Sequence, residues 1–342
     1  MNPQEYLAQE LKASAKYILT EEDQKVIKFE GIGTFIFRKL KSKKFRKTKI
    51  DPSSEEVVKK AIRLNVEKNE PIKFTYPFGG YKIWRLPSYP EVDWAEFMAI
   101  AHIIQYVAPI AAAYEPGVEV FFCADDIIIE KIDNSPREKL DAYLSSFNKL
   151  LEEFSKYLPN NLKLTLFRAA DLFTPDEYEA ELNKARDGLL AKGISPERMV
   201  EVKRLSEFNF VTKGRVDYSK LSKVEREKMF EELAYFGESY LSIPKRRAFN
   251  RAENKIVIFS NPLPNALDIG STKTSKAKFW AGTGVLECED EKYYDRIITP
   301  KQWEETKDEA KEVPVSLIPM MNFKKVLVFQ RRLNFLSDKT DD

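Results

Sequence analysis

The stretch Val118-Glu119-Val120-Phe121-Phe122-Cys123, which continues into Ala124-Asp125-Asp126, is the strongest indicator of the fold class. Its first six residues are apolar at every position but one, a pattern typical of a strand that is buried on both faces of a parallel sheet. Helical sequence surrounds it, from Asp93 to Tyr114 before it and from Pro136 to Tyr157 after it. A second strand, Leu162–Phe167, comes next. This strand–helix–strand order predicts a parallel crossover and hence an α/β protein with a Rossmann-like, mostly parallel sheet flanked by helices.

The composition predicts a folded chain. Of the 342 residues, 43% are hydrophobic and 32% are charged, which excludes global disorder and suffices for one large domain or two joined ones. The formal net charge is only +2, so the overall charge requires no nucleic-acid or membrane partner. Cys123 and Cys288 form no disulfide framework, and no apolar leader follows a basic head at Met1–Lys16. We therefore expect a cytoplasmic protein, with the apolar segment Phe97–Tyr114 as a core helix and no membrane span.

Towards the N-terminus, the sequence predicts a hairpin, a basic segment and a helix. Lys25–Glu30 and Thr34–Phe37 are predicted to be short strands around Gly31-Ile-Gly33. The segment Arg38–Lys49 holds eight basic residues and no acidic one. We interpret this basic segment as solvated and dispensable for the fold, with nucleic-acid binding as the alternative. Ser53–Val66 has the apolar spacing of an amphipathic helix.

Towards the C-terminus, the sequence predicts a helical insertion and then more strands. Pro175–Leu241 is charged and helical, with breaks near Gly193 and at Lys213-Gly214. The strands that follow are expected to rejoin the first sheet, and they are Lys255–Phe259, Ala277–Leu286 and Lys325–Phe329. The chain is thus divided into residues 1–70 (hairpin, basic segment and helix), 71–174 (α/β core), 175–250 (helical insertion), 251–336 (returning strands) and 337–342 (disordered tail).

Asp125 and Asp126 stand directly after the buried strand, and ligands of open α/β sheets bind beyond the carboxyl ends of the strands. A carboxylate there can bind Mg²⁺, accept a hydrogen bond from a sugar hydroxyl or act as a base. The alternative is a solvated turn, since Asp is a common turn residue, which leads into a further strand at Ile127–Glu130. We expect Asp125 to lie at the end of a central strand and to border a cleft.

A second candidate is the loop Tyr76-Pro77-Phe78-Gly79-Gly80-Tyr81-Lys82, which follows a strand predicted at Ile72–Tyr76. Paired glycines let the backbone approach a ligand closely, and Lys82 and Arg85 add cations that suit a phosphate or a carboxylate. The alternative is a tight loop packed by aromatic residues. Asp93 and Glu96, which are expected to form a capping box at the start of the next helix, would repel an anion there.

Arg168 ends a predicted strand, where it can bind an anionic substrate or form a salt bridge with Asp171. His102 is the only histidine, which leaves no basis for a His-based zinc site or a Ser–His–Asp triad. We interpret it as a buried core residue. Proton transfer therefore rests on Asp, Glu, Lys or Tyr. The cationic cluster Lys245-Arg246-Arg247 is interpreted as a solvated face.

Residues 71–171 resemble the isonitrile synthase family of pyoverdine and dityrosine biosynthesis proteins. The matching pieces are Tyr76-Pro77, the helix start from Pro90 to Glu96, the turn Tyr114-Glu115-Pro116-Gly117, and Ala124-Asp125-Asp126 after the strand. Asp126 replaces a glycine of the family, Lys82 matches the family's lysine only after a shift, and a late histidine-containing strand has no counterpart.

The resemblance implies an enzyme that condenses an amino-acid amine with a phosphorylated ketose, with a small anionic molecule as its partner and with no cofactor or metal. The implied site comprises Asp125, Asp126 and Lys82 as catalytic residues and Tyr76, Gly79, Gly80, Tyr81, Arg85 and Arg168 as substrate-binding residues. Lys82, Arg85 and Arg168 are expected to share one phosphate. Two alternatives stay open: a glycosyltransferase that uses a divalent metal on Asp125 and Asp126, and a non-enzymatic nucleic-acid-binding protein that uses Arg38–Lys49.

Overall fold

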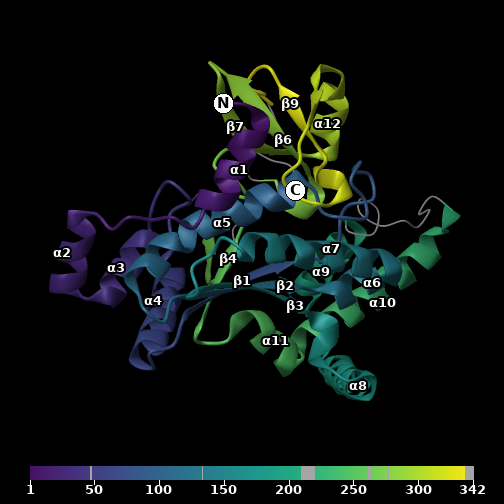
Figure 1. Ribbon diagram of the computed structural model, residues 1–342. Coiled ribbons are helices and arrows are strands. Elements are labelled where there is room, and N and C mark those ends of the chain that lie inside the picture. Colours follow the sequence, from purple (N-terminus) through teal and green to yellow (C-terminus); the bar gives the residue numbers. More distant parts are fainter. Residues whose placement is uncertain (47, 133, 209–219, 261–262, 276, 336–342) are drawn as a thin grey trace.

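The computed structural model describes residues 1–46, 48–132, 134–208, 220–260, 263–275 and 277–335. In these residues the chain forms a five-stranded sheet and a four-stranded sheet with helices packed around them (Figure 1). The helices are α1 (Pro3–Ala13), α2 (Glu21–Glu30), α3 (Ile32–Leu40), α4 (Pro52–Glu67), α5 (Trp94–Ala113), α6 (Asp126–Ile132), α7 (Arg137–Ser155), α8 (Pro175–Lys192), α9 (Pro196–Phe208), α10 (Lys223–Ser242), α11 (Pro244–Arg251) and α12 (Pro300–Thr306). The strands are β1 (Ile72–Phe78), β2 (Val118–Ala124), β3 (Leu162–Arg168), β4 (Lys255–Phe259), β5 (Ala266–Asp268), β6 (Thr283–Glu289), β7 (Lys292–Ile298), β8 (Lys311–Pro314) and β9 (Lys325–Phe329).

The five-stranded sheet confirms the predicted α/β core. Its strand order is β3-β2-β1-β4-β5, and every neighbouring pair is parallel. Strand β2 lies inside the sheet, with Val118 opposite Ile72 of β1 and opposite Leu162 of β3. Helices α5 and α7 lie above the sheet and α11 lies below it in Figure 1. Because helices cover both faces of the sheet, a strand inside it, such as β2, has apolar residues at nearly every position.

Helix α5 is the core helix that the sequence predicts. It begins with a capping box, in which the Asp93 carboxylate accepts from the N–H of Ala95 at 2.7 Å and the Glu96 carboxylate accepts from the N–H of Asp93 at 2.8 Å. The helix continues through Pro109 to Ala113, so the proline does not divide it. Its length and composition would allow it to cross a membrane, yet 89% of its most apolar window is buried inside the protein, as in the core of a soluble protein.

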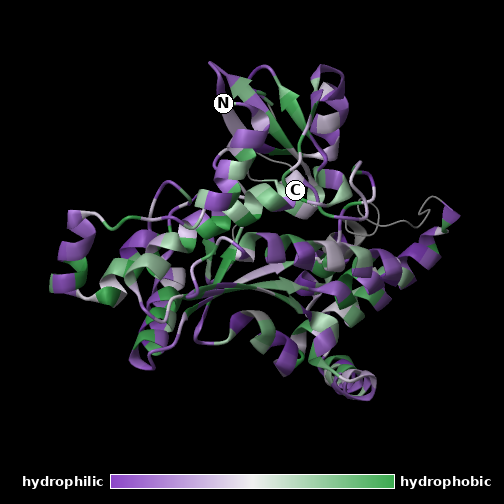
Figure 2. Cartoon of the chain, in the orientation of Figure 1, coloured by the Kyte–Doolittle hydropathy of each residue, from purple (hydrophilic) through white to green (hydrophobic). Residues whose placement is uncertain are grey.

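The prediction that all later strands rejoin the first sheet is wrong. Only β4 and β5 join it, and β6 to β9 form a second sheet with the order β7-β6-β9-β8. Helix α5 contacts β2 on one side and β6 and β7 on the other, so it lies between the two sheets. This placement explains why α5 is apolar around most of its circumference. Figure 2 shows the hydrophobic residues gathered on the strands and inner helices, with hydrophilic residues outside.

The predicted N-terminal hairpin is also wrong, because residues 21–40 form α2 and α3. Thr20 and Asp23 make a capping box that starts α2, and a capping box specifies a helix more strongly than β-branched residues specify a strand. Gly31 has a φ of +88° and separates the two helices. Phe35, Ile36 and Leu40 of α3 are buried, at a spacing that one helix face provides.

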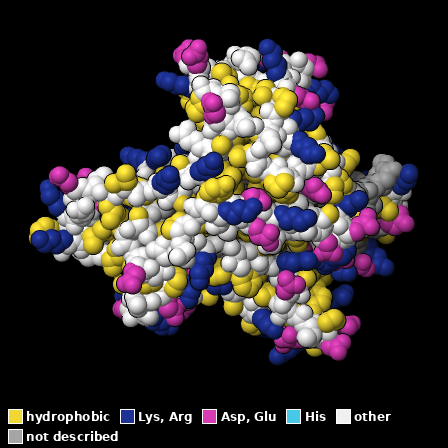
Figure 3. All heavy atoms as spheres, viewed as in Figure 1, with side chains coloured by type: hydrophobic (Ala, Val, Ile, Leu, Met, Phe, Trp, Pro, Cys, Tyr) yellow, Lys and Arg dark blue, Asp and Glu magenta, His cyan; other side chains and the backbone are white. Residues whose placement is uncertain are grey.

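The strand predicted at Ile127–Glu130 is a helix, α6, which begins at Asp126. The interpretation of residues 175–241 as helical is confirmed for the described part by α8, α9 and α10. The break at Lys213-Gly214 and the tail 337–342 lie outside the described residues. Figure 3 shows Lys and Arg side chains mixed with Asp and Glu over the helical region at the lower right, which agrees with the small net charge.

The basic segment Arg38–Lys49 is anchored to the fold and is not a solvated extension. Leu40 and Phe45 are buried, and the Leu40 carbonyl accepts from the hydroxyl of Tyr106 at 2.8 Å. Lys39 pairs with Asp23 at 2.6 Å and donates to the Tyr17 hydroxyl at 2.7 Å. These contacts contradict the interpretation of the whole segment as dispensable.

We expect Lys39→Gln to lower the free energy of unfolding by about 1 kcal/mol, because the partly buried carboxylate of Asp23 loses its cation. Lys43→Gln is the matched control, since Lys43 is exposed and surface charges contribute little. Urea denaturation of both variants measures the difference. Equal stability of the two variants would contradict a structural role for Lys39.

Candidate active site

Asp126 is the second residue after β2 and the first residue of α6. It is fully buried, and hydrogen-bond donors surround its carboxylate. Its Oδ2 atom accepts from Arg137 Nη1 at 2.8 Å and from Arg168 Nε and Nη2 at 3.1 and 3.0 Å. Its Oδ1 atom accepts from the N–H of Ala170 at 3.0 Å. A buried carboxylate with this many partners is held in place and has little capacity left for a substrate. Asp126 therefore fixes the positions of two arginines at the carboxyl end of the sheet.

Arg168 links Asp126 to α7, where its Nη2 atom donates to Asp141 Oδ1 at 2.5 Å. Burial lowers the pKa of Arg168, but the hydrogen bonds to Asp141 and Asp126 outweigh burial and raise it above its ordinary value. The salt bridge with Asp171 that the sequence suggested is replaced by these two partners. Arg168 and Asp126, both predicted site residues, are thus brought together.

Asp125, the last residue before α6, reaches a different group of partners. Its Oδ1 atom accepts from the Tyr240 hydroxyl at 2.6 Å, and its Oδ2 atom pairs with the guanidinium of Arg246. The Asp125 and Arg246 side chains are 14% and 15% exposed. Burial, and next the charge of Asp125, raises the pKa of Tyr240 well above its ordinary value, so this hydroxyl keeps its proton. The position at the carboxyl end of an interior strand confirms where the sequence placed Asp125, and a cleft beside it stays a prediction.

The loop between β1 and α5 passes directly beside this edge of the sheet. The Phe78 carbonyl accepts from the N–H of Asp125 at 2.8 Å. Gly80 has a φ of +76°, and a Cβ atom there would lie 2.9 Å from the Cβ of Ala124. A Cβ at Gly79 would collide with the ring of Tyr81 at 2.3 Å. The two glycines are therefore required by packing against β2 and Tyr81, in addition to any role towards a ligand.

We expect Gly80→Ala to lower the free energy of unfolding by about 2 kcal/mol, because alanine is strained at positive φ and its Cβ is too close to Ala124. Gly188→Ala is the matched control. Gly188 lies in α8, and a Cβ atom added there would meet no atom within 4 Å, so alanine should stabilise that helix by about 0.5–1 kcal/mol. Thermal or urea denaturation tests both. A Gly80→Ala protein as stable as the wild type would show that the loop rearranges freely.

Lys82 belongs to a second cluster, which is buried. Its Nζ atom lies 3.0 and 2.9 Å from the Glu96 carboxylate oxygens and 3.1 Å from Asp93 Oδ1. The Tyr143 hydroxyl donates to Glu96 at 3.1 Å, and the Ser88 hydroxyl donates to Asp93 at 2.7 Å. The cation that the sequence assigned to a ligand is therefore neutralised by the capping box of α5.

Burial raises the pKa of Glu96 to about 8, and the charge of Lys82 opposes part of that rise. Burial, followed by the charge of Glu96, also raises the pKa of Tyr143 well above its ordinary value. A carboxyl group that titrates near neutral pH is suited to proton transfer. It is equally a feature of a buried lysine–carboxylate cluster. Lys82 and Glu96 are buried, and of this cluster only Asp93 and Ser88 line a cavity, the one between α5 and the second sheet.

The remaining predicted residues divide between core and surface. Tyr76 is buried among the rings of Phe259 and Phe279, and Tyr81 is buried as well. Arg85 is exposed and lies over the ring of Trp84. The structure thus assigns Lys82, Arg85 and Arg168 to three separate surroundings, which gives no support to one phosphate shared by all three. Their roles in binding stay predictions.

The carboxylates at this edge are paired with guanidinium groups. Asp126 contacts Arg137 and Arg168, and Asp125 contacts Arg246. A divalent metal on this pair would have to displace those arginines, which does not favour the metal-dependent glycosyltransferase. In the described ranges, no three His, Cys, Asp or Glu side chains gather where they could hold a metal.

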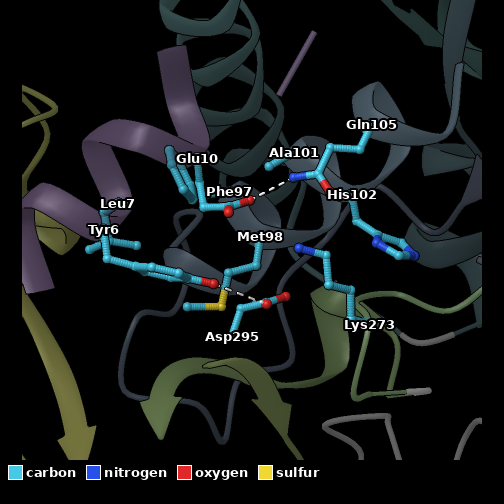
Figure 4. Close-up of a pocket in the computed structure, with 10 residues that line it drawn as sticks. All are labelled: Tyr6, Leu7, Glu10, Phe97, Met98, Ala101, His102, Gln105, Lys273 and Asp295. Atoms are coloured by element: carbon cyan, nitrogen blue, oxygen red, sulfur yellow. Dashed lines mark hydrogen bonds between the residues drawn. The ribbon is translucent and has the colours of Figure 1, made fainter. Parts of the chain in front are cut away.

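A third polar cluster lies between α1, α5 and β7 (Figure 4). The Tyr6 hydroxyl donates to Asp295 at 3.3 Å, and Gln105 donates to Glu10 at 2.6 Å. In Figure 4 the side chain of Lys273 extends towards Asp295. His102 is buried beside the ring of Phe45, as predicted for a core residue.

Burial raises the pKa of both Asp295 and Glu10, and Lys273 partly opposes this. The cavity at the centre of this cluster is about 10 Å³, which accommodates about one water molecule and no substrate. The cluster therefore fastens α1 and the second sheet to α5.

Several residues of the candidate site were not identified from the sequence. Arg137, Asp141, Tyr240 and Arg246 contact Asp125, Asp126 or Arg168 from α7, α10 and α11. The interpretation of Lys245-Arg246-Arg247 as a solvated face is wrong for Arg246, because its side chain is only 15% exposed and pairs with Asp125. Nothing in the local sequence distinguishes the inward-facing arginine of that cluster from its solvated neighbours.

Comparison with known proteins identifies a structural neighbour and no family. No family model matches the chain, and no curated protein matches it. Among solved structures, the chain is similar to the crystal structure of the PvcA protein from Pseudomonas aeruginosa, with a TM-score of 0.58 and 16% sequence identity. The match covers 87% of this chain and 99% of that protein. A likeness of this kind shows a shared α/β fold.

Proposed function

We propose that the chain is a biosynthetic enzyme of the isonitrile synthase type, which condenses an amino-acid amine with a phosphorylated ketose. The observation that carries the proposal is the place of the resemblance in the fold. Its pieces fall on β1, α5 and β2, and the last one supplies Asp125 at the carboxyl end of β2. The PvcA protein is similar in structure over 87% of this chain. Ligands of such sheets bind at this edge.

The chemistry of that condensation suits the groups around Asp125. The amine nitrogen attacks the ketose carbonyl, and both amine protons leave with the carbonyl oxygen as water, so the site must move two protons from nitrogen to oxygen. The isonitrile then forms when both carbon–carbon bonds of that carbon break, one fragment leaving its bonding electrons on the carbon and the other departing with them and taking up a proton. In the proposal, Asp125 is the carboxylate that exchanges protons, because it reaches solvent while Asp126 does not. The Tyr240 hydroxyl orients Asp125, and Arg246 supplies a guanidinium for the phosphate. Asp126 and Lys82 act as positioning residues.

The test is the reaction itself. The purified chain is incubated with each common amino acid and a panel of pentulose and hexulose phosphates, and the product is identified by the isonitrile band in its infrared spectrum. Asp125→Asn should slow product formation by about a hundredfold, as expected for loss of an acid–base group, and Asp171→Asn should leave it unchanged. Absence of isonitrile from every pair, with a folded protein, would refute the proposal.

A further inference from the structure

A cavity of about 390 Å³ lies between the start of α5 and the second sheet. Its apolar lining comes from Trp94 of α5, Trp303 of α12, Leu327 of β9 and Met321 of the loop before β9. Met321 is 69% exposed, which places it at the mouth. A volume of this size, with a mainly apolar lining and a few polar groups, is typical of a site for a small organic molecule.

The walls of the cavity are fixed by contacts between distant parts of the chain. The Trp94 indole N–H donates to the Lys325 carbonyl at 2.7 Å. Gly284 of β6 packs so closely on α5 that a Cβ atom there would lie 2.2 Å from the N atom of Ala95. The cavity is therefore a preformed feature of the junction between the sheets, and a ligand would lose little affinity to rearrangement.

The polar groups of the cavity are mainly hydrogen-bond acceptors. The side-chain amide of Asn322 donates to the Ser88 carbonyl at 3.0 Å and to the Val92 carbonyl at 3.1 Å. These two bonds orient the amide, and its Oδ1 atom accepts no hydrogen bond from the described residues. The Thr283 hydroxyl also has no partner among the described residues, but its oxygen is enclosed by protein and not open to the cavity. A ligand that donates a hydrogen bond would satisfy Asn322 Oδ1.

The charges around the cavity balance. The lining contains Asp93 and Glu312 as acids and Lys324 and Lys325 as bases. Asp93 is already 3.1 Å from Lys82, and Glu312 pairs with Lys325 at 2.5 Å. Lys324 is exposed, so solvent screens its charge. A charged ligand would therefore lose its hydration here and gain little counter-charge in return, and the lining favours an uncharged ligand.

We propose that this cavity is a binding site for an uncharged, partly apolar organic molecule that donates a hydrogen bond from a hydroxyl or N–H group. Its apolar body packs against Trp303 and Leu327, and its donor reaches Asn322 Oδ1. The site lies at the second sheet, away from Asp125, and the inference does not depend on the proposed reaction.

The first experiment compares four probes of similar shape in ligand-observed NMR titrations with the full chain. Benzyl alcohol is neutral and carries the donor, benzyl methyl ether lacks the donor, and benzylamine and benzoate carry charges. We expect benzyl alcohol to saturate with a dissociation constant of about 1 mM, as usual for a fragment of this size. The ether should bind about fivefold more weakly, which corresponds to one hydrogen bond. Equal binding of alcohol and ether, tighter binding of a charged probe, or no saturation by the alcohol would overturn the proposal.

The second experiment locates the probe. Asn322→Leu should weaken benzyl alcohol binding about fivefold, and Leu327→Trp tests the site alone if that variant does not fold. Leu327→Trp fills the cavity and should abolish binding, while the melting curve shows that the variant is folded. Asn148→Leu, an exposed change on α7, is the matched control. Binding that is unchanged in Leu327→Trp would place the probe elsewhere and refute the site.

Discussion

Replacing Asp126 by alanine is expected to lower the free energy of unfolding by about 3–4 kcal/mol. The carboxylate is fully buried and accepts hydrogen bonds from Arg137, Arg168 and the N–H of Ala170. Its removal leaves two guanidinium groups and a buried backbone N–H without their common acceptor, and breaking a buried ion pair on one side costs this much. Arg137 and Arg168 are 35% and 27% exposed, so partial rehydration keeps the loss below the upper end of the range for such pairs. Urea denaturation monitored by circular dichroism measures it.

Asp171→Ala is the matched control, because Asp171 is the partner that sequence proximity suggests for Arg168. Asp171 is exposed, and the arginine is bonded to Asp126 and Asp141 instead. The control should change the stability by less than about 0.5 kcal/mol. If the two substitutions destabilised the protein equally, the cluster around Asp126 would not be the structural centre described above.

Replacing Lys82 by methionine is expected to cost about 3 kcal/mol near neutral pH. Methionine keeps the length of the side chain, so the packing is largely conserved, but Asp93 and Glu96 lose the cation between them. Lys163→Met, an exposed change in β3, is the control and should have little effect. A methionine variant as stable as the wild type would mean that Lys82 is not essential to the cluster, and that its burial serves another purpose.

The loss of stability caused by Lys82→Met should depend on pH, because Glu96 titrates. Burial raises the folded-state pKa of Glu96 from 4.5 to about 8, so the stabilisation from its proton is complete below about pH 4.5 and is lost as the pH rises towards 8. In the wild type this loss stops above pH 8, because the ionised Glu96 pairs with Lys82. In Lys82→Met the folded-state pKa is higher still, so the loss continues at about 1.4 kcal/mol per pH unit.

The difference between wild type and Lys82→Met should therefore be larger at pH 9 than at pH 6. Adding Glu96→Gln to the methionine variant removes the titrating group and should recover most of the extra loss at pH 9. Denaturant unfolding of the three proteins at both pH values measures this. A difference that stays constant with pH would show that Lys82 does not influence the ionisation of Glu96 between pH 6 and pH 9.

Patterns that are local in the sequence predicted local structure well. The apolar run Val118–Cys123 specified a strand buried on both faces, and Asp93 with Glu96 specified the start of α5. The fold class and the place of Asp125 followed from the order of these elements. The hairpin at residues 25–37 failed because β-branched and aromatic residues also fit one face of a helix, and the capping box at Thr20 and Asp23 favours the helix.

The second sheet could not be predicted, because its central hairpin lacks the usual turn signal. Asp290 and Glu291 occupy the turn between β6 and β7, both with positive φ. Asn and Gly are the residues that normally mark such a turn. Sequence spacing also gives no measure of which sheet a strand will join. The strands β6 and β7 pack instead on α5, because the second apolar face of that helix must be covered.

The sequence predicted the parallel core, the core helix and the carboxylate at the end of an interior strand, since hydrophobic periodicity and helix capping depend on residues only a few positions apart. It did not predict which charged groups pair with each other, because these pairs form only in the folded chain. Arg168 pairs with Asp126 and not with the nearby Asp171, and Arg246 reaches Asp125 from 121 residues away. An ion pair forms where folding removes both groups from water at one place, and that place depends on packing across the whole chain.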